Sequence, residues 1–531
     1  MKRFYYYPAV LMTTLLLTFS SCSESDTYLN VIPKDAGPVA SLNLTSLGEK
    51  AGIGDSNNKE AVAKLTEMLK NEMKAASFEK MEAIINNPKK AGVDLRKPIY
   101  IFGNDDFFVA ATAKVLNKED LMNTFKMIEA EGNMRSLSEE ENGYNLAVVN
   151  NKTFAAFNDK TLIMAQYKKI ADLEKMKQDA FTLLNQKKEE SLAADKGFIK
   201  MTETESDMSF YASFKDMSES YSLLYDEFTG VADASEKSKM ISEINFEKGK
   251  VDIEAEFYTE DKELKKAIEE KCNYLKSIDN SLLKYFPKST LGVISIGMDG
   301  KKMYDMMMSS NDFKKNFSVN DAEKIGMIMQ NLGDEVSIGV VDFSLTQSPS
   351  VLIIAEAENG DALKEIYEIS KKDKETTTDK NKKERNRRYN SSKSEMIELK
   401  ENEYVIKERS SNYFICYKKN HIYITNNENL YKNIGNSVSP SAEDNSYASA
   451  IKGSKYAIAV NMQAIYELPY IKILSEMGGK ETKNYIDMVK SIDNIYVKYD
   501  DKYNLTIQLV NTKENALKQF GNFAKGFAGI Q

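Results

Sequence analysis

The chain has 531 residues, of which 42% are hydrophobic and 29% are charged, and its formal net charge is −8. This balance is typical of a globular protein and excludes a largely disordered chain. The length favours two or more domains. Because a mildly acidic chain is a poor ligand for polyanions, we expect no nucleic-acid partner.

The N-terminal segment is typical of a bacterial secretory signal. A basic pair precedes an apolar stretch, residues 9–19, and two serines then lead to Cys22. The stretch is shorter than the roughly 20 apolar residues that span a bilayer, so cleavage is expected rather than a transmembrane anchor. The four residues ending at Cys22 resemble a bacterial lipobox, although Phe19 stands where Leu is usual. We expect residues 1–21 to be a lipoprotein signal peptide and Cys22 to be lipidated, with an ordinary secretory signal as the alternative.

The residues after Cys22 favour a particular location. Residues 22–29 form a short acidic tether, in which Ser23-Glu24-Ser25-Asp26 resembles the surface-export signal of Bacteroidota lipoproteins. The alternative is a tether that is merely solvated. Two or three acyl chains anchor a protein stably, since each buried CH₂ contributes about 0.8 kcal/mol. We therefore expect a lipid-anchored protein of the cell envelope, at the outer membrane, on its periplasmic or its surface face.

Few residues are available for catalysis or metal binding. His421 is the one histidine, so a HExxH zinc site is excluded, and no GxSxG, GxxxxGK[ST] or GxGxxG motif occurs. The acidic pairs Asp105-Asp106 and Asp500-Asp501 lack the alternating ligands that calcium needs, so turns are expected there. We predict no metal and no cofactor. Cys272 and Cys416 are expected to be buried free thiols, with a disulfide as the alternative.

Two parts of the chain resemble each other. Pro33-Lys34 is followed by Val39 and Ser41, and Pro287-Lys288 is followed at the same spacing by Val293 and Ser295. Further matches keep the same order along the chain, which is typical of an internal repeat. We predict two tandem homologous halves, residues 30–280 and 281–531.

The predicted elements recur in the same order in both halves. In the first half we expect strands at 39–44, 98–102, 107–115, 153–157, 161–164, 208–214 and 251–257, with helices near 62–69 and 118–131. In the second half we expect strands at 292–297, 336–343, 351–358, 413–417, 421–424, 456–460 and 505–509, with a helix at 361–371. Period-2 alternation and short turns indicate antiparallel hairpins. The fold class is therefore α+β, and each half is expected to be a mostly antiparallel sheet with helices packed on one face.

A basic segment, residues 371–394, interrupts the second half only. It carries almost no apolar side chain, so we expect a disordered insertion. A solvated loop is one interpretation. The other is contact with a polyanion, such as an anionic glycan or lipid headgroups. The residues for that contact would be Lys382, Lys383, Arg385, Arg387 and Arg388.

Taken together, the lipobox-like N-terminus and the strand PKDAGPVASLNL with its echo PKSTLGVISIGM resemble an uncharacterised Bacteroidota lipoprotein family that carries a domain of unknown function. The resemblance covers the mature chain and implies no catalytic residue. We predict a non-enzymatic binding or scaffold protein, held at the membrane by Cys22, with an envelope protein or a glycan as its partner. Two alternatives remain: a hydrolase that uses Asp and Glu on glycan or peptidoglycan, and a purely structural envelope assembly factor.

Overall fold

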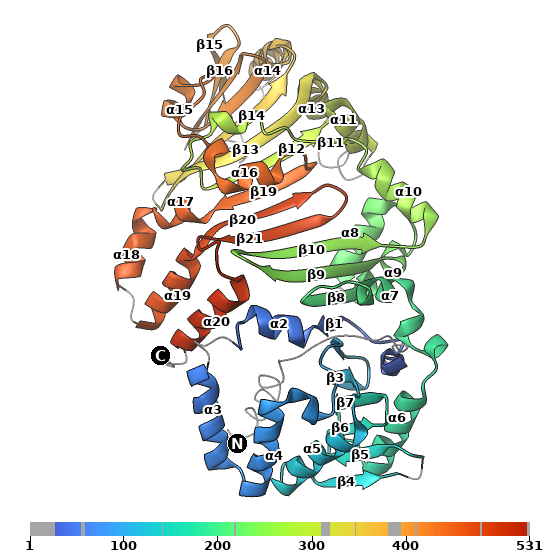
Figure 1. Ribbon diagram of the computed structural model, residues 1–531. Coiled ribbons are helices and arrows are strands. Elements are labelled where there is room, and N and C mark those ends of the chain that lie inside the picture. Colours follow the sequence, from blue (N-terminus) through green and yellow to red (C-terminus); the bar gives the residue numbers. More distant parts are fainter. Residues whose placement is uncertain are drawn as a thin grey trace. The chain divides into compact units, whose positions relative to one another are not determined.

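The computed structural model describes residues 27–54, 59–140, 142–216, 219–309, 319–345, 347–380, 395–408, 411–477 and 480–527. It divides into two compact units (Figure 1). Of the described residues, those from 27 to 265 and from 511 to 527 form unit 1, and those from 266 to 510 form unit 2. Residues 511–527, which we expected to close the second half, therefore belong to unit 1.

The elements of unit 1 alternate between hairpins and helices. Its strands are β1 (Val39–Leu42), β2 (Ile99–Phe102), β3 (Phe107–Lys114), β4 (Ser136–Glu139), β5 (Asn145–Val148), β6 (Thr153–Phe157), β7 (Thr161–Tyr167), β8 (Met208–Ser213), β9 (Lys239–Glu247) and β10 (Lys250–Tyr258). Its helices are η1 (Thr27–Val31), α2 (Leu44–Lys50), α3 (Lys59–Glu72), α4 (Ala75–Asn86), η3 (Pro88–Ala91), α5 (Lys118–Ala130), α6 (Leu173–Asn185), η4 (Lys188–Glu190), η5 (Leu192–Ala194), α7 (Lys196–Thr202), η6 (Phe214–Asp216), α8 (Glu219–Thr229), α9 (Ala234–Lys237) and α20 (Ala516–Phe527); α10 (Lys262–Lys271) leads from this unit into unit 2.

All of these strands join one antiparallel sheet. Hydrogen-bonded neighbours give the order β4-β5-β6-β7-β3-β2-β1-β8-β9-β10. The β9–β10 hairpin is the longest regular pair, with Val251 opposite Phe246 and Phe257 opposite Met240. Its second strand confirms the strand predicted for residues 251–257, but the apolar face is not buried throughout, since Phe257 is 47% exposed.

Helices cover both faces of the unit 1 sheet, so the prediction of helices on one face was wrong. On β6, Phe154 and Ala156 pack in one apolar cluster with residues of α6. The neighbouring Ala155 and Phe157 pack in another cluster with residues of α5. Successive side chains of a strand point to opposite faces, so a run that is apolar at every position is covered on both sides. Figure 1 shows α5 and α6 on either side of these strands.

The elements of unit 2 follow the same plan. Its strands are β11 (Leu275–Lys276), β12 (Gly292–Met298), β13 (Leu332–Ser344), β14 (Gln347–Ala357), β15 (Glu395–Lys400), β16 (Glu403–Lys407), β17 (Asn412–Lys418), β18 (His421–Thr425), β19 (Tyr456–Asn461), β20 (Ile492–Tyr499) and β21 (Tyr503–Leu509). Its helices are η7 (Leu283–Tyr285), α11 (Gly300–Ser309), α13 (Val319–Asn331), α14 (Asp361–Lys380), α15 (Glu428–Lys432), η8 (Ala442–Asp444), α16 (Ser446–Ile451), α17 (Met462–Tyr466), α18 (Pro469–Met477) and α19 (Lys480–Lys490).

The unit 2 sheet is antiparallel and repeats the strand order of unit 1. Its order is β15-β16-β17-β18-β14-β13-β12-β19-β20-β21, and the short β11 pairs with the end of β12. Replacing β1–β10 of unit 1 by β12–β21 in sequence gives this same order. The isolated bridge Pro33–Ser191 in unit 1 also has a counterpart, Pro287–Ser441, in unit 2. The α+β class is thus confirmed in both units.

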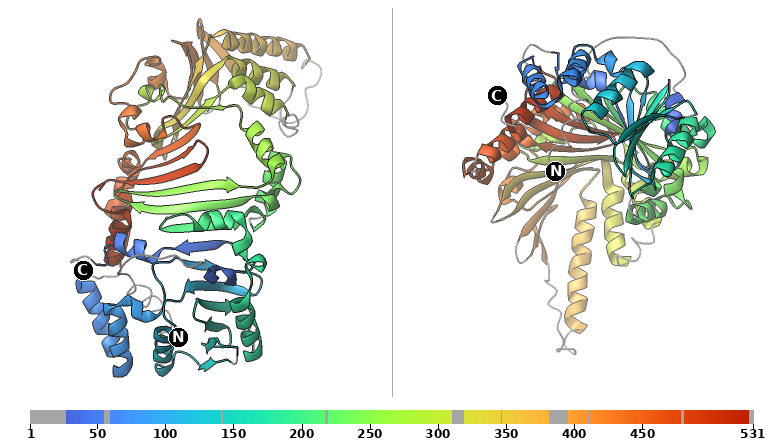
Figure 2. Two further views of the ribbon diagram at one scale, coloured as in Figure 1. Left: turned by 45° about the vertical axis from the view of Figure 1, so that its right-hand side comes forward. Right: turned by 90° about the horizontal axis from the view of Figure 1, so that it is seen from below.

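Helix α14 is longer than the sequence suggested. It continues from Asp361 to Lys380, so residues 371–380 are helical where we expected the start of a disordered insertion (Figure 2). Their lack of apolar side chains favoured a loop, but lysine and glutamate are good helix formers, and the segment extends a helix already anchored by buried Leu363. The rest of the insertion, residues 381–394, lies outside the described residues.

Candidate functional site

The residues predicted to carry the anchor and the polyanion contact lie outside the described part of the chain. These are Cys22, Lys382, Lys383, Arg385, Arg387 and Arg388. The first described element is η1, where Tyr28 and Leu29 are buried in the core of unit 1. No described helix is both long and apolar enough to cross a membrane.

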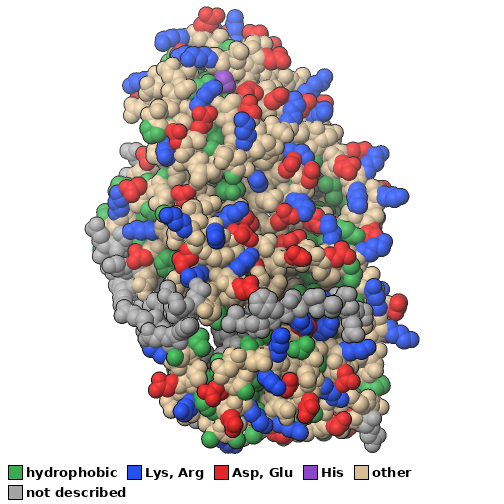
Figure 3. Space-filling model, in the orientation of Figure 1, with side chains coloured by type: hydrophobic (Ala, Val, Ile, Leu, Met, Phe, Trp, Pro, Cys, Tyr) green, Lys and Arg blue, Asp and Glu red, His purple; other side chains and the backbone are tan. Residues whose placement is uncertain are grey.

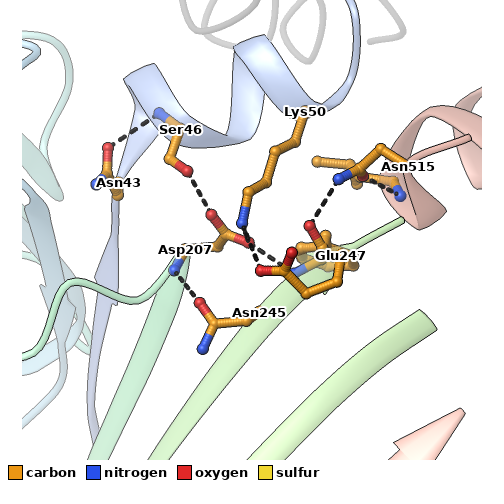
Figure 4. Close-up of polar contacts among 9 residues, drawn as sticks. Asn43, Ser46, Lys50, Asp207, Asn245, Glu247 and Asn515 are labelled. Carbon is orange, nitrogen blue, oxygen red and sulfur yellow. Dashed lines mark hydrogen bonds and ion pairs between the residues drawn. The ribbon is translucent and has the colours of Figure 1, made fainter. Parts of the chain in front are cut away.

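A buried polar network of unit 1 surrounds Asp207, just before β8 (Figure 4). Its side chain is 1% exposed. Lys50 at the end of α2 donates to Asp207 Oδ2 from 2.8 Å, and Ser46 Oγ donates to Asp207 Oδ1 from 2.5 Å. The backbone N–H of Phe246 on β9 donates to Oδ2 from 2.6 Å. One carboxylate therefore joins a helix and two strands.

The same network reaches the C-terminal helix. Asn515 Nδ2 donates to the Phe246 carbonyl from 2.7 Å, and Asn515 Oδ1 accepts from the N–H of Leu517 at the start of α20. Burial by itself lowers the pKa of Lys50, but Asp207 and then Glu247, 3.4 Å away, outweigh it and the net shift is upward. The charges of this network are paired within the protein, and removal of one partner of such a buried pair is strongly destabilising.

A second buried carboxyl group, that of Glu335, lies near the beginning of β13 in unit 2. It is 2% exposed, and its Oε2 accepts from the backbone N–H groups of Asp279 and Asn280 at 3.0 and 3.1 Å. Ser337, bonded to Ser295 at 2.7 Å, donates to Oε1 from 3.4 Å. Glu335 thus holds the turn that precedes η7.

The carboxyl groups of Glu335 and Asp279 have opposite pKa shifts. Burial, helped by the hydrogen-bonded Asp279, raises the pKa of Glu335 to about 7, although the backbone N–H groups of Asp279 and Asn280 act to lower it. Burial also acts to raise the pKa of Asp279, but hydrogen bonds from Ser281 and Glu335 outweigh it and the net shift is downward. Below pH 7 the opposite shifts favour a protonated Glu335 beside an ionised Asp279.

A cavity of about 250 Å³ opens in unit 1 where α7, α9, β9 and the end of β10 meet. Its lining is mostly charged: Asp195, Glu236, Lys237, Lys239, Tyr258, Thr259, Glu260 and Asp261. Two of the acids cap helices, since Asp195 accepts from the N–H of Phe198 and Asp261 from that of Leu264. Hydrogen bonding from that N–H lowers the pKa of Asp261, which the nearby Lys237 lowers further.

His421 and the two described cysteines form no catalytic group with other residues in the part of the chain that the structure describes. His421 begins β18, where Nδ1 lies 2.6 Å from the Lys419 carbonyl and the ring packs against Tyr285. Cys272 and Cys416 are free thiols, half-buried and buried respectively. Burial raises the pKa of Cys416 to about 12, which keeps it a thiol at neutral pH.

Among the described residues no metal site is formed, and charges of both signs are mixed on the face that Figure 3 shows. No three His, Cys, Asp or Glu side chains among the described residues are grouped to hold a metal ion. On the face drawn in Figure 3, lysine and arginine are interspersed with aspartate and glutamate. The acidic pairs at 105–106 and 500–501 lie in the β2–β3 and β20–β21 turns, as predicted.

Sequence reasoning did not find the three places described above. Asp207 and Lys50 are far apart in the chain and have no motif spacing, and Glu335 is one acidic residue among many. A signal could have come from Asp207, which directly precedes β8, and from Glu335, which lies within β13 beside the apolar Val336.

Two units with one shared antiparallel strand order define a two-unit α+β protein. A family model described as "Domain of unknown function (DUF4836)" matches residues 28–517, so the chain belongs to that family. No curated protein and no solved structure matches the chain.

Proposed function

We propose that this protein is a lipid-anchored envelope lipoprotein of the Bacteroidota type that binds a partner or ligand and catalyses no reaction. The observation that carries the proposal is the short distance from Cys22 to the folded body. Tyr28 is already buried, and six residues span at most about 20 Å. An acylated Cys22 would hold unit 1 against the outer membrane.

The binding role is supported by how the charged groups are used. Asp207 and Lys50 stabilise a buried junction, while the described cavity is lined by groups that suit recognition by charge and hydrogen bonds. We also propose that the units arose by duplication, which the common strand order and the paired bridges at Ser191 and Ser441 support. A duplicated scaffold lets one copy keep a site while the other diverges.

The Glu335–Asp279 pair is the one observation that favours the hydrolase alternative. A protonated and an ionised carboxyl group side by side are what acid–base catalysis needs. Glycosidases, however, separate their two carboxyl groups by about 5–9.5 Å to admit the substrate, whereas these two groups bond to each other. Release of sugar from peptidoglycan that disappears in Glu335→Gln would establish the hydrolase.

Partition between detergent-rich and aqueous phases tests the anchor. The wild-type chain, isolated from its membranes, is expected in the detergent-rich phase and the Cys22→Ala variant in the aqueous phase. Cys272→Ala removes a thiol without touching the lipobox and should behave as wild type. The proposal would be overturned if Cys22→Ala entered the detergent-rich phase to the same extent as the wild type.

A further inference from the structure

The cavity of unit 1 lies where unit 2 has a hydrogen-bonded contact between a helix and a strand. Lys239 at the start of β9 lines the cavity, and Lys196, which begins α7, follows the lining residue Asp195. Lys239 lies opposite Ser213 of β8, and at the corresponding place of unit 2 Asn494 lies opposite Asn461 of β19.

In unit 2 this contact consists of direct hydrogen bonds. Ser446, which begins α16 as Lys196 begins α7, donates to Asp493 Oδ2 from 2.6 Å and accepts from Asn494 Nδ2. Short side chains thus join helix to strand in unit 2. In unit 1 the corresponding residues are two lysines that cannot bond to each other, and the gap of about 250 Å³ remains.

Some of the charges around the cavity are paired within the protein. Lys237 Nζ lies 3.3 Å from Asp261, and Lys196 Nζ lies 2.6 Å from Glu260.

Three lining charges form no ion pair with another described residue: Asp195, Glu236 and Lys239. The Asp195 carboxylate is held by the Phe198 N–H at the start of α7 and by the Tyr211 hydroxyl, and Lys239 donates to the neutral Ser213 hydroxyl from 3.2 Å. Beside the hydrogen-bonded Asp195, one cation and one anion without an ion-pair partner therefore line the same cavity.

We propose that this cavity binds a small zwitterion, a free α-amino acid. Its carboxylate is held by Lys239 and its ammonium group by Glu236, with Tyr258 and Thr259 lining the remainder. The volume lies below the roughly 300–1,000 Å³ of sites for drug-sized ligands, which fits a ligand of this size. The inference rests on the proposed binding function and specifies its ligand.

Isothermal titration calorimetry on the full-length chain in detergent tests the assignment. The probes are the common free L-amino acids, each compared with its N-acetylated and its amidated form. Charge-assisted hydrogen bonds contribute about 1.5–3 kcal/mol. Lys239→Gln and Glu236→Gln are therefore each expected to lower the affinity for the most tightly bound amino acid by at least about tenfold.

The derivatives separate recognition of charge from a change in folding. Glu236→Gln should not lower the affinity for the N-acetylated form further, because that form lacks the ammonium group. Lys262→Gln and Glu263→Gln, on the neighbouring α10 and outside the cavity lining, should leave the affinity unchanged.

Absence of binding by every free amino acid, or equal affinity in Lys239→Gln, would overturn the assignment. Either result would leave the anchor intact, because phase partition of Cys22→Ala is measured without a ligand. Binding of a neutral sugar instead would contradict the zwitterion and retain a binding function.

Discussion

Unit 1 carries Asp207 directly before β8, whereas unit 2 carries Lys455 directly before the corresponding strand β19. Asp207 is buried and is bonded by Lys50, Ser46 and a backbone N–H. Lys455 is 31% exposed and reaches Asp501, which is 88% exposed, at 3.0 Å. The same position in one strand order thus holds a buried anion in one unit and a surface cation in the other.

At a second pair of corresponding positions, unit 2 has the buried polar pair and unit 1 has an aromatic side chain. Ser41 of β1 lies opposite Tyr100 of β2, while Ser295 of β12 lies opposite Ser337 of β13. Tyr100 packs against Tyr28 and Phe198 in the core of unit 1. Unit 2 instead buries a hydroxyl pair next to Glu335. The backbone plan is common to the units, and the buried polar groups are specific to each.

The largest effect is expected from Asp207→Ala. It removes the acceptor of Lys50 and leaves Ser46 and the Phe246 N–H without their buried partner, and breaking a buried pair costs about 3–5 kcal/mol. Hydrogen exchange should show this loss in β8 and β9 of unit 1.

Asp501→Ala is the matched control, because it removes the acid of the exposed pair in unit 2. Surface ion pairs contribute only about 0–1 kcal/mol. Similar losses in the two variants would show that burial does not distinguish these positions.

A smaller effect, with a defined pH dependence, is expected from Glu335→Gln. A pKa raised from 4.5 to about 7 means that the folded state binds the proton more tightly than the unfolded state. This stabilisation is complete below pH 4.5 and is lost as the pH rises through 7. The shift corresponds to about 3 kcal/mol at 1.36 kcal/mol per pKa unit.

Urea titrations at pH 5 and pH 8, followed by circular dichroism, measure that dependence. Wild type should lose stability between these pH values and Glu335→Gln should lose less, since the amide oxygen still accepts from the turn. Glu365→Gln, on the exposed face of α14, should keep the wild-type dependence. An unchanged pH dependence in Glu335→Gln would assign the loss to other groups.

Much of the fold could be predicted because a strand or a turn leaves a pattern in a few consecutive residues. The alternation at 251–257 and the Asn158 turn between β6 and β7 gave the correct elements. The coverage of both faces was missed at Phe154–Phe157, although an uninterrupted apolar run is typical of a strand buried on both sides.

The polar sites could not be predicted in the same way. Lys50 and Asp207 meet only after three strands are aligned, and the pKa of Glu335 depends on backbone N–H groups at residues 279 and 280. The cavity residues were not singled out because the charges of Lys239 and Glu236 matter only once their neighbours are paired.

Hydrogen exchange of the full-length chain at pH 5 and pH 8, corrected for intrinsic chemical exchange, tests most directly the claim that one strand order carries different buried charges. Protection of β12 and β13 in unit 2 is predicted to fall by about 2–3 kcal/mol as Glu335 ionises. Protection of β8 and β9 in unit 1, held by Asp207, is predicted to stay constant. An equal fall in both units, or none in unit 2, would contradict the account.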